Sequence, residues 1–456
     1  MHNKLLTLFE SIRTSFWFIP SALVLIATIV AKLLIAFDSY QQEPTELSEL
    51  LPFLSQVYQA SPESIRSILT LIAGSMMTVT SIAFSITVVA LSLASSQFGP
   101  RLIRHFMADK GTQSVLGVFV AIFIYCVLVL QATKDHEGFV FVPGMSAYFA
   151  VFLAFVGVGV LIYFIHHVAQ AIQADNVVND VYCRLLNNVE QWFPDDENDS
   201  EDSEQTKSAD AHTIDLPLAQ CYKHNKTVLA CGDGYIQALN TKRLVTIAQN
   251  KQVAIEINCM AGDFVTPSSS LLDIYYDEDA ALECLDDMRS CFMLGAKRTP
   301  IQDPEFAIHQ LVEIAVRALS PGINDPYTAI TCVDKLSAFL CILAERPFPS
   351  SKHLDSDGTL RVKTKLIEFS SLGEAAFNQI RQYGKDSIAV TIRLIDSLNR
   401  ISSTCHTAEQ IQFVSRQNEM IEESMSQLFI STYDRHDITS RLNEVKSSIS
   451  KCNIEY

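Results

Sequence analysis

The 456-residue sequence has little positive charge. Its 34 Lys and Arg residues are outnumbered by 51 Asp and Glu residues, so the formal net charge is -17 and the pI is near 5.1. A surface that binds nucleic acid needs clustered Lys and Arg to neutralise phosphate groups, and the sequence has no basic cluster of this kind. The composition therefore argues against nucleic acid as a partner.

Motifs of known catalytic sites are also missing. The sequence contains no nucleophile elbow, P-loop, HExxH motif or dinucleotide-binding fingerprint. Its 11 cysteines show no CxxC or CxH spacing, which argues against both a zinc site and a secreted disulfide framework. These absences predict no enzymatic activity, no cofactor and no bound metal. Four cysteines are interpreted as small buried hydrophobic side chains: Cys284, Cys291, Cys332 and Cys341.

Two histidine patterns leave alternatives open. His309 lies one helical turn from Glu305 and Glu313 and could act as a general base, but such pairs are ordinary on helix surfaces. His166 and His167 are adjacent, so on a helix their rings point about 100° apart and cannot easily share one metal ion. We interpret this pair as a polar cap at the level of the lipid headgroups.

Charged residues are scarce over four long stretches. Hydrophobic residues make up 48% of the sequence, charged residues 19%, and the mean hydropathy is +0.19. A helix needs about 20 apolar residues to cross a bilayer. The first stretch is longer than the core of a signal peptide and has no small-residue cleavage site, so we expect it to remain as an anchor. Four transmembrane helices are predicted within a domain at 1–168: 16–37, 68–98, 115–131 and 146–165.

The distribution of Lys and Arg predicts the orientation, because short cytoplasmic loops retain these residues. Lys4 and Arg13 precede the first stretch, and Arg101 lies between the second and third. The loop at 38–66 is instead rich in Glu, and its apolar spacing at 47–58 predicts a short surface helix. We therefore expect four crossings with both termini in the cytoplasm.

The second stretch is expected to form an unusually long helix. Ser61-Pro62 is an N-terminal capping signal, and Gly99-Pro100 is a natural stop. A helix between them would measure roughly 55 Å at about 1.5 Å per residue. Small and hydroxylated residues recur along it at intervals of three, four or seven, which places them on one stripe: Gly74, Thr78, Ser81, Ser85, Ser92 and Ser96.

This hydroxyl stripe has two interpretations. It could line a water-filled path in a homo-oligomer, with Arg101, Arg104 and His105 at the inner mouth. Alternatively, it could pack closely against another helix, with each hydroxyl hydrogen-bonded within the protein. No Asp, Glu or Arg lies in the middle of any of the four stretches, which argues against a proton relay or an ion-coupled transporter.

The remaining sequence predicts a soluble α+β region. The fold class is therefore an α-helical membrane protein with four transmembrane helices and a cytoplasmic α+β region. Seven of the ten residues at 195–204 are acidic, which is typical of a flexible linker. The expected parts are a connecting helix at 169–193, an acidic linker at 194–212, a small β-rich subdomain at 213–295 and a helical subdomain at 296–456.

Short apolar runs between turn residues predict strands at 228–231, 253–257 and 271–275. The turn at Gly262-Asp-Phe-Val265 resembles one half of a biotinyl/lipoyl-like β-sandwich. This resemblance implies a strand layout only, because no lysine stands at the hairpin tip where such domains carry a prosthetic group. Helical periodicity then predicts helices at 303–319, 326–345, 362–381, 387–402, 408–429 and 438–450.

A turn-rich segment separates the first two of these helices. Ser320-Pro321-Gly322 ends one helix, and Asp325-Pro326 begins the next as N-cap and first residue. The segment is either purely structural or an exposed turn that binds a protein partner. The candidate interaction residues are Ser320, Pro321, Gly322, Asn324, Asp325 and Pro326.

Two segments, Ser96-Gln-Phe-Gly-Pro-Arg101 and Arg317-Ala-Leu-Ser-Pro-Gly-Ile-Asn-Asp-Pro326, resemble the bacterial membrane-protein family called domain of unknown function 2254. Gln113 and Asp303 fit the same pattern, and Gly99 stands where we expect a serine in many members. The resemblance spans nearly the whole chain. It implies a bacterial inner-membrane location and no particular activity.

Three functions remain in order of preference. The first is a homo-oligomeric membrane protein that passes ions or small solutes passively and is regulated by its cytoplasmic region. The second is a membrane-anchored interaction or sensing module without transport activity, whose protein partner the sequence does not identify. The third, an enzyme acting on lipid, would need a catalytic cluster assembled from distant residues.

Overall fold

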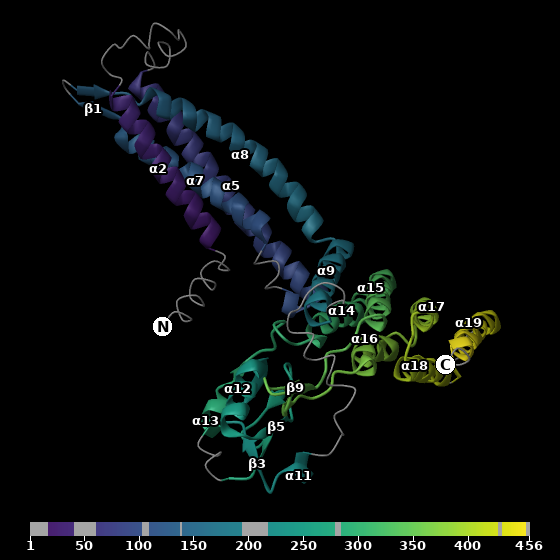
Figure 1. Cartoon of the computed structure of the whole chain (residues 1–456). Helices are drawn as coiled ribbons and strands as arrows, with labels where there is room; N and C mark the ends of the chain where they lie inside the picture. The colour runs from purple at the N-terminus through teal and green to yellow at the C-terminus, as the bar shows by residue number, and fades with distance from the viewer. Residues whose placement is uncertain are drawn as a thin grey trace. The chain divides into compact units, whose positions relative to one another are not determined.

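The computed structural model describes residues 17–40, 61–102, 109–136, 139–193, 218–278, 284–426 and 431–452. The chain divides into two compact units, Met1–Val177 and Val178–Tyr456, whose elements are labelled in Figure 1. The division falls within a helix rather than in a linker. The surface helix expected at 47–58 and the acidic linker expected at 194–212 lie outside the described residues.

The described part of the first unit consists of four long helices and one small hairpin. Each predicted apolar stretch coincides with a helix, and the third and fourth helices extend beyond it at both ends. The short helix η1 (Pro100–Leu102) follows the second long helix, and strands β1 (Lys134–His136) and β2 (Phe139–Phe141) pair antiparallel. The long helices are α2 (Phe18–Tyr40), α5 (Pro62–Phe98), α7 (Lys110–Ala132) and α8 (Gly144–Ala171).

Local chemistry sets the ends of α5 as the sequence predicts. The Ser61 side chain accepts a hydrogen bond from the Ser64 backbone N–H at 3.2 Å, and Pro62 occupies the first turn. At the other end Gly99 has φ of +109°, a conformation that L-residues rarely adopt. The helix therefore stops where only glycine fits without strain.

Helix α7 is the centre of the first unit and packs against α2, α5 and α8. Phe119 and Tyr125 on this helix are fully buried. It approaches α2 closely, because a Cβ on Gly117 would lie 2.7 Å from Leu23 Cδ1 and 2.9 Å from the Cα of Pro20. Small residues allow this kind of close packing where no hydrophobic force drives apolar helices together.

The β-rich part of the second unit contains two sheets. The first is a mixed five-stranded sheet in the order β3 (His224–Leu229), β7 (Ser270–Tyr276), β5 (Ala254–Ile257), β10 (Leu360–Lys363) and β9 (Lys352–Leu354). Strands β5 and β10 pair in parallel, and the other neighbours are antiparallel. The second sheet is antiparallel, in the order β6 (Phe264–Val265), β4 (Gly234–Leu239) and β8 (Phe292–Gly295).

The sequence predicts only part of this layout. The strands expected at 253–257 and 271–275 are present as β5 and β7. The helix α12 (Thr241–Lys251) was not predicted. The helix predicted at 362–381 is wrong at its start, since Val362 and Lys363 belong to β10. The layout differs from a lipoyl-like sandwich, which is built from antiparallel strands. It contains one parallel pair of strands and three helices, α11 (Leu218–Cys221), α12 and α13 (Leu285–Arg289).

A buried ion pair fixes the hairpin of β9 and β10. Arg361 Nε donates to Asp355 Oδ2 at 2.6 Å, and both side chains are almost fully buried. Burial acts to raise the pKa of Asp355, but hydrogen bonds from Arg361, Thr359 and Asp357 hold it below its ordinary value. Arg361 also donates to Gln252 Oε1 just after α12, which ties the hairpin to the preceding half of the sheet.

The helical part of the second unit surrounds one long apolar helix. The predicted connecting helix at 169–193 is interrupted, because α8 ends at Ala171 and a new helix begins at Ala174. The long apolar helix, α15, has Leu336, Leu340 and Leu343 fully buried. The helices are α9 (Ala174–Trp192), α14 (Glu305–Ala318), α15 (Pro326–Ala344), α16 (Phe369–Tyr383), α17 (Ile388–Ser402), α18 (Ala408–Ser426) and α19 (Thr432–Cys452).

Two glycines of the first unit provide a matched test of its packing. Gly117→Ala should lower the free energy of unfolding by about 1–3 kcal/mol, because the added methyl overpacks the contact with α2. Gly74→Ala on α5 should be neutral or slightly stabilising, since nothing lies within 4 Å of the new Cβ. Thermal unfolding in detergent measures both, and equal midpoints would contradict the close approach of α2 and α7.

Candidate functional site

The hydroxyl stripe lies on the side of α5 that the other described helices do not cover. All six stripe residues are exposed, from Gly74 to Ser96. The buried residues of α5, such as Leu69, Met76 and Ala83, lie on the opposite side of the helix at about 100° per residue. Packing among the described residues therefore does not account for the stripe.

The hydroxyls of the stripe fall into two groups. Thr78 Oγ1 donates to the Gly74 carbonyl at 3.0 Å, and Ser96 Oγ donates to the Leu93 carbonyl at 2.8 Å, so these two bond to their own helix. Ser81, Ser85 and Ser92 have no hydrogen-bond partner among the described residues. A lipid-facing hydroxyl either stays unpaired, at a cost of about 1–3 kcal/mol, or bonds to a carbonyl of its own helix as Thr78 and Ser96 do.

The expected inner mouth is only partly described. Arg101 belongs to η1, whereas Arg104 and His105 lie outside the described residues. Close to it in sequence, Asp109 caps α7 by accepting hydrogen bonds from the backbone N–H groups of Gly111 and Thr112. The structure thus places a capped helix start just after the basic segment.

Asp109 also joins α7 to α8. Its Oδ2 lies 2.7 Å from His167 Nε2, and the imidazole stacks on the Tyr163 ring with centroids 5.4 Å apart. Burial acts to raise the pKa of Asp109, but hydrogen bonds from Thr112 and His167 lower it overall. His167 is therefore a specific partner of one carboxylate as well as a polar residue near a helix end, which the sequence did not predict.

A second polar cluster ties the opposite ends of the same helices. Asp38, expected in a loop, lies in the last turn of α2 and is fully buried. It accepts hydrogen bonds from the backbone N–H groups of Met145 and Ser146 at the start of α8 and from Ser146 Oγ. Tyr125 Oη donates to the Ser146 carbonyl at 2.9 Å. An acidic residue at a helix N-terminus is electrostatically favourable, so this cluster positions α8.

The turn at 320–326 is well ordered by its own hydrogen bonds. The Asn324 N–H donates to the Ser320 carbonyl at 2.9 Å, and the Asp325 side chain caps α15 by accepting from the Thr328 N–H. Asn324 has φ of +51°, which asparagine tolerates better than most residues. Pro321, Gly322 and Asn324 are exposed, whereas Ser320, Asp325 and Pro326 are half-buried.

His309 belongs to an ion-pair network rather than to an isolated acid–base pair. Its Nε2 lies 3.3 Å from Glu305 Oε2, and Arg298 contacts the same oxygen at 3.4 Å while binding Asp303 through two nitrogens. The hydrogen bond to His309 and the nearby Arg298 lower the pKa of Glu305, although burial acts to raise it. Gly262 packs directly on the Arg298–Asp303 pair, so the network joins the β-rich part to the start of α14.

No metal or thiol centre emerges from the described residues. Within them, no group of three His, Cys, Asp or Glu residues could hold a metal ion. Cys284, Cys291 and Cys332 are buried as predicted, and Cys341 is half-buried. Burial raises the pKa of the Cys291 thiol, which keeps it in the unreactive protonated form.

The long apolar helices of the first unit, with their polar groups paired at the helix ends, define an integral membrane protein. Of the described helices, five are long and apolar enough to cross a membrane: the four of the first unit and α15. The model of a family described as "Predicted membrane protein (DUF2254)" matches residues 13–400. The chain therefore belongs to this family, as its two motif segments predict; α18 and α19 follow the matched region.

Curated relatives agree with this assignment. An uncharacterized protein of Mycobacterium bovis is 30% identical over 388 residues, covering 83% of this chain and 71% of the relative. Two uncharacterized proteins of Mycobacterium tuberculosis match with the same identity and coverage. No solved structure matches the chain. Neither the family description nor those of these relatives names an enzymatic activity.

Proposed function

We propose that the protein is a homo-oligomer of a bacterial inner membrane in which α5 helices of several copies face one another across a passive path for ions or small solutes. The observation that carries this proposal is the set of exposed serines at 81, 85 and 92 without partners among the described residues. In hydrocarbon each of these hydroxyls could bond only to a carbonyl of its own helix, as Thr78 and Ser96 do. Water in a path, or a second α5, would supply the missing hydrogen bonds.

Four crossings, rather than five, fit the chemistry of α15. Its buried face packs within the second unit, and its charged residues have partners there. Asp334 Oδ1 lies 3.4 Å from Arg393 Nη1. Lys335 Nζ donates to Asn179 Oδ1 at 3.0 Å and lies 4.7 Å from the centre of the Tyr182 ring. A helix placed in lipid would lose these contacts and leave two charges unpaired, at a cost of about 2.5–3.5 kcal/mol each.

A second candidate function is a membrane-anchored interaction module. It is favoured by the apolar side chains around the turn at 320–326: Ile323 is 39% exposed and Tyr327 is 79% exposed. Exposed aromatic residues on a rigid backbone are typical anchors for a protein partner. Because Asp325 and Asn324 already have local structural roles, the recognition residues in this candidate are Ile323 and Tyr327.

The count of crossings can be measured with reporter fusions. An even number returns the C-terminus to the side on which the chain starts, which the distribution of Lys and Arg places in the cytoplasm. A green fluorescent protein fused after Tyr456 should therefore fluoresce, and alkaline phosphatase fused there should be inactive. Active phosphatase at this position would contradict four crossings.

The conduction proposal predicts a position-specific loss of current. Purified protein in planar bilayers should conduct, and Ser85→Leu should lower the current about fivefold if one hydroxyl contact contributes about 1 kcal/mol. Ser75→Leu is the matched control, because Ser75 is exposed on the same helix but lies about 80° away from Ser85 around its axis. Silence of folded protein across voltages and tensions, or equal losses in both variants, would refute the path.

The interaction candidate predicts a contact at one tyrosine. A photo-crosslinking amino acid at position 327 should capture one protein in stoichiometric amount in living cells, and Ile323→Ser should abolish the capture. The same amino acid at position 383 is the control, since Tyr383 is also exposed, at 64%, but lies on α16. Identical capture patterns at the two positions would count against a specific partner at this turn.

A further inference from the structure

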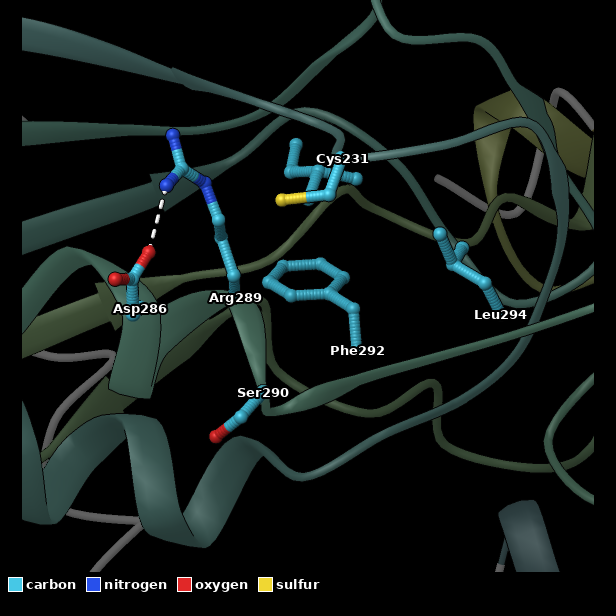
Figure 2. A pocket seen from close by; sticks show the side chains of 7 residues that line it. Cys231, Asp286, Arg289, Ser290, Phe292 and Leu294 are labelled. Carbon is cyan, nitrogen blue, oxygen red and sulfur yellow. Dashed lines mark hydrogen bonds and ion pairs between the residues drawn. The ribbon is translucent and has the colours of Figure 1, made fainter.

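A cavity of about 400 Å³ lies in the β-rich part of the second unit, and its lining includes no residue of either candidate site. Strand β7 contributes Leu271, strand β8 contributes Phe292 and Leu294, and the turn after β3 contributes Cys231. In Figure 2 the Cys231 sulfur and the Phe292 ring turn toward the middle of the cavity, with Arg289 and Leu294 on opposite sides. The cavity is partly open to solvent and mostly apolar in its lining, and its volume is in the range of small-molecule sites.

One cation is fixed at the edge of this apolar space. Arg289 Nε donates to the Leu229 carbonyl at 3.2 Å, and its Nη1 donates to Asp286 Oδ1 at 2.8 Å. The second terminal nitrogen, Nη2, has no partner among the described residues. The guanidinium is therefore held in place by the backbone and still has N–H groups to donate.

The carboxylate of Asp286, which pairs with Arg289, contributes less to ligand recognition than the guanidinium. The Asp286 side chain is 94% exposed and pairs with Arg289 three residues along the chain, whereas the Arg289 side chain is 32% exposed. Exposed pairs of this kind contribute little, because water solvates the free ions well. An incoming anion can thus bind the guanidinium beside Asp286 or in its place. Asp286 is too exposed to hold a cation in a fixed geometry.

We propose that this cavity binds a small monocarboxylate with an apolar body. The carboxylate accepts hydrogen bonds from Arg289, as in the charge-assisted pairs that guanidinium groups favour. The apolar body lies against Phe292, Leu271 and Leu294 and covers the Cys231 thiol. This site concerns the second unit alone and does not depend on conduction by the first.

The position of Cys231 provides the measurement. The full-length protein in non-ionic detergent is alkylated with iodoacetamide, and the rate at each cysteine is followed by mass spectrometry. The probes are benzoate and hexanoate, with methyl benzoate and hexylammonium as comparison compounds. Cys183 and Cys221 are exposed thiols outside the cavity and serve as internal controls.

Benzoate or hexanoate at ten times its Kd leaves about a tenth of the cavities empty, so alkylation of Cys231 should slow about tenfold. Rates at Cys183 and Cys221 should not change. Arg289→Gln should raise the Kd at least about tenfold, as expected for losing one charge-assisted contact. Arg243→Gln is the matched control, because Arg243 forms an exposed pair with Asp287 at 3.4 Å and does not line the cavity.

A second variant fills the cavity without touching the cation. Leu294→Trp should abolish protection of Cys231 by both carboxylates. The alkylation rates of Cys183 and Cys221 should equal those in the unaltered protein, which shows that the variant is folded. The proposal is overturned if neither carboxylate slows alkylation of Cys231. It is also overturned if methyl benzoate or hexylammonium protects equally well, or if Arg289→Gln leaves the Kd unchanged.

Discussion

The first unit is governed by the absence of hydrogen-bonding solvent in the membrane interior. Every polar group there must find a partner within the protein or remain costly. Asp38 meets this constraint by capping α8, and Arg66 donates to the Thr133 carbonyl at 3.0 Å. Asp109 caps α7 and contacts His167 on α8. The exposed serines of α5 differ, because they have no hydrogen-bond partner among the described residues. The proposed oligomer would supply these partners.

Because of the same constraint, an apolar composition alone does not place a helix in the membrane. Helix α15 is apolar enough to cross a bilayer, yet the charges on it pair with α9 and α17. In α5 the buried face is also apolar, but the exposed face carries the hydroxyls of the stripe. Whether a helix fits lipid or a protein core therefore depends on what each of its faces contacts, more than on mean hydropathy.

Sequence patterns predicted the elements whose causes are local. The cap at Ser61, the cap at Asp325 and the long apolar stretches depend on neighbouring residues, and each is present in the structure. The family assignment also follows from two contiguous segments. Each of these features can be predicted without knowing which residues distant in sequence come into contact.

The features that sequence reasoning missed depend on distant contacts. Asp38 reaches Ser146 across 108 positions, and His167 reaches Asp109 across 58. Val362 follows a helical pattern locally but pairs with Ile255 in the sheet, because a central strand position buries more apolar surface than an exposed helix end. The one signal available beforehand was an acidic residue next to the first and the third apolar stretch, at Asp38 and Asp109.

The parallel pairing of β5 with β10 has a consequence for biosynthesis. Lys363 bonds Glu256 across 107 positions, so the middle of the sheet lacks its neighbour until the intervening helices have left the ribosome. At about 5–20 residues per second, this delay lasts roughly 5–20 s. During that interval the edge of β5 is open, and a nascent chain that stops between the two strands would expose it to aggregation. The strand order thus delays completion of the five-stranded sheet until β10 has been synthesised.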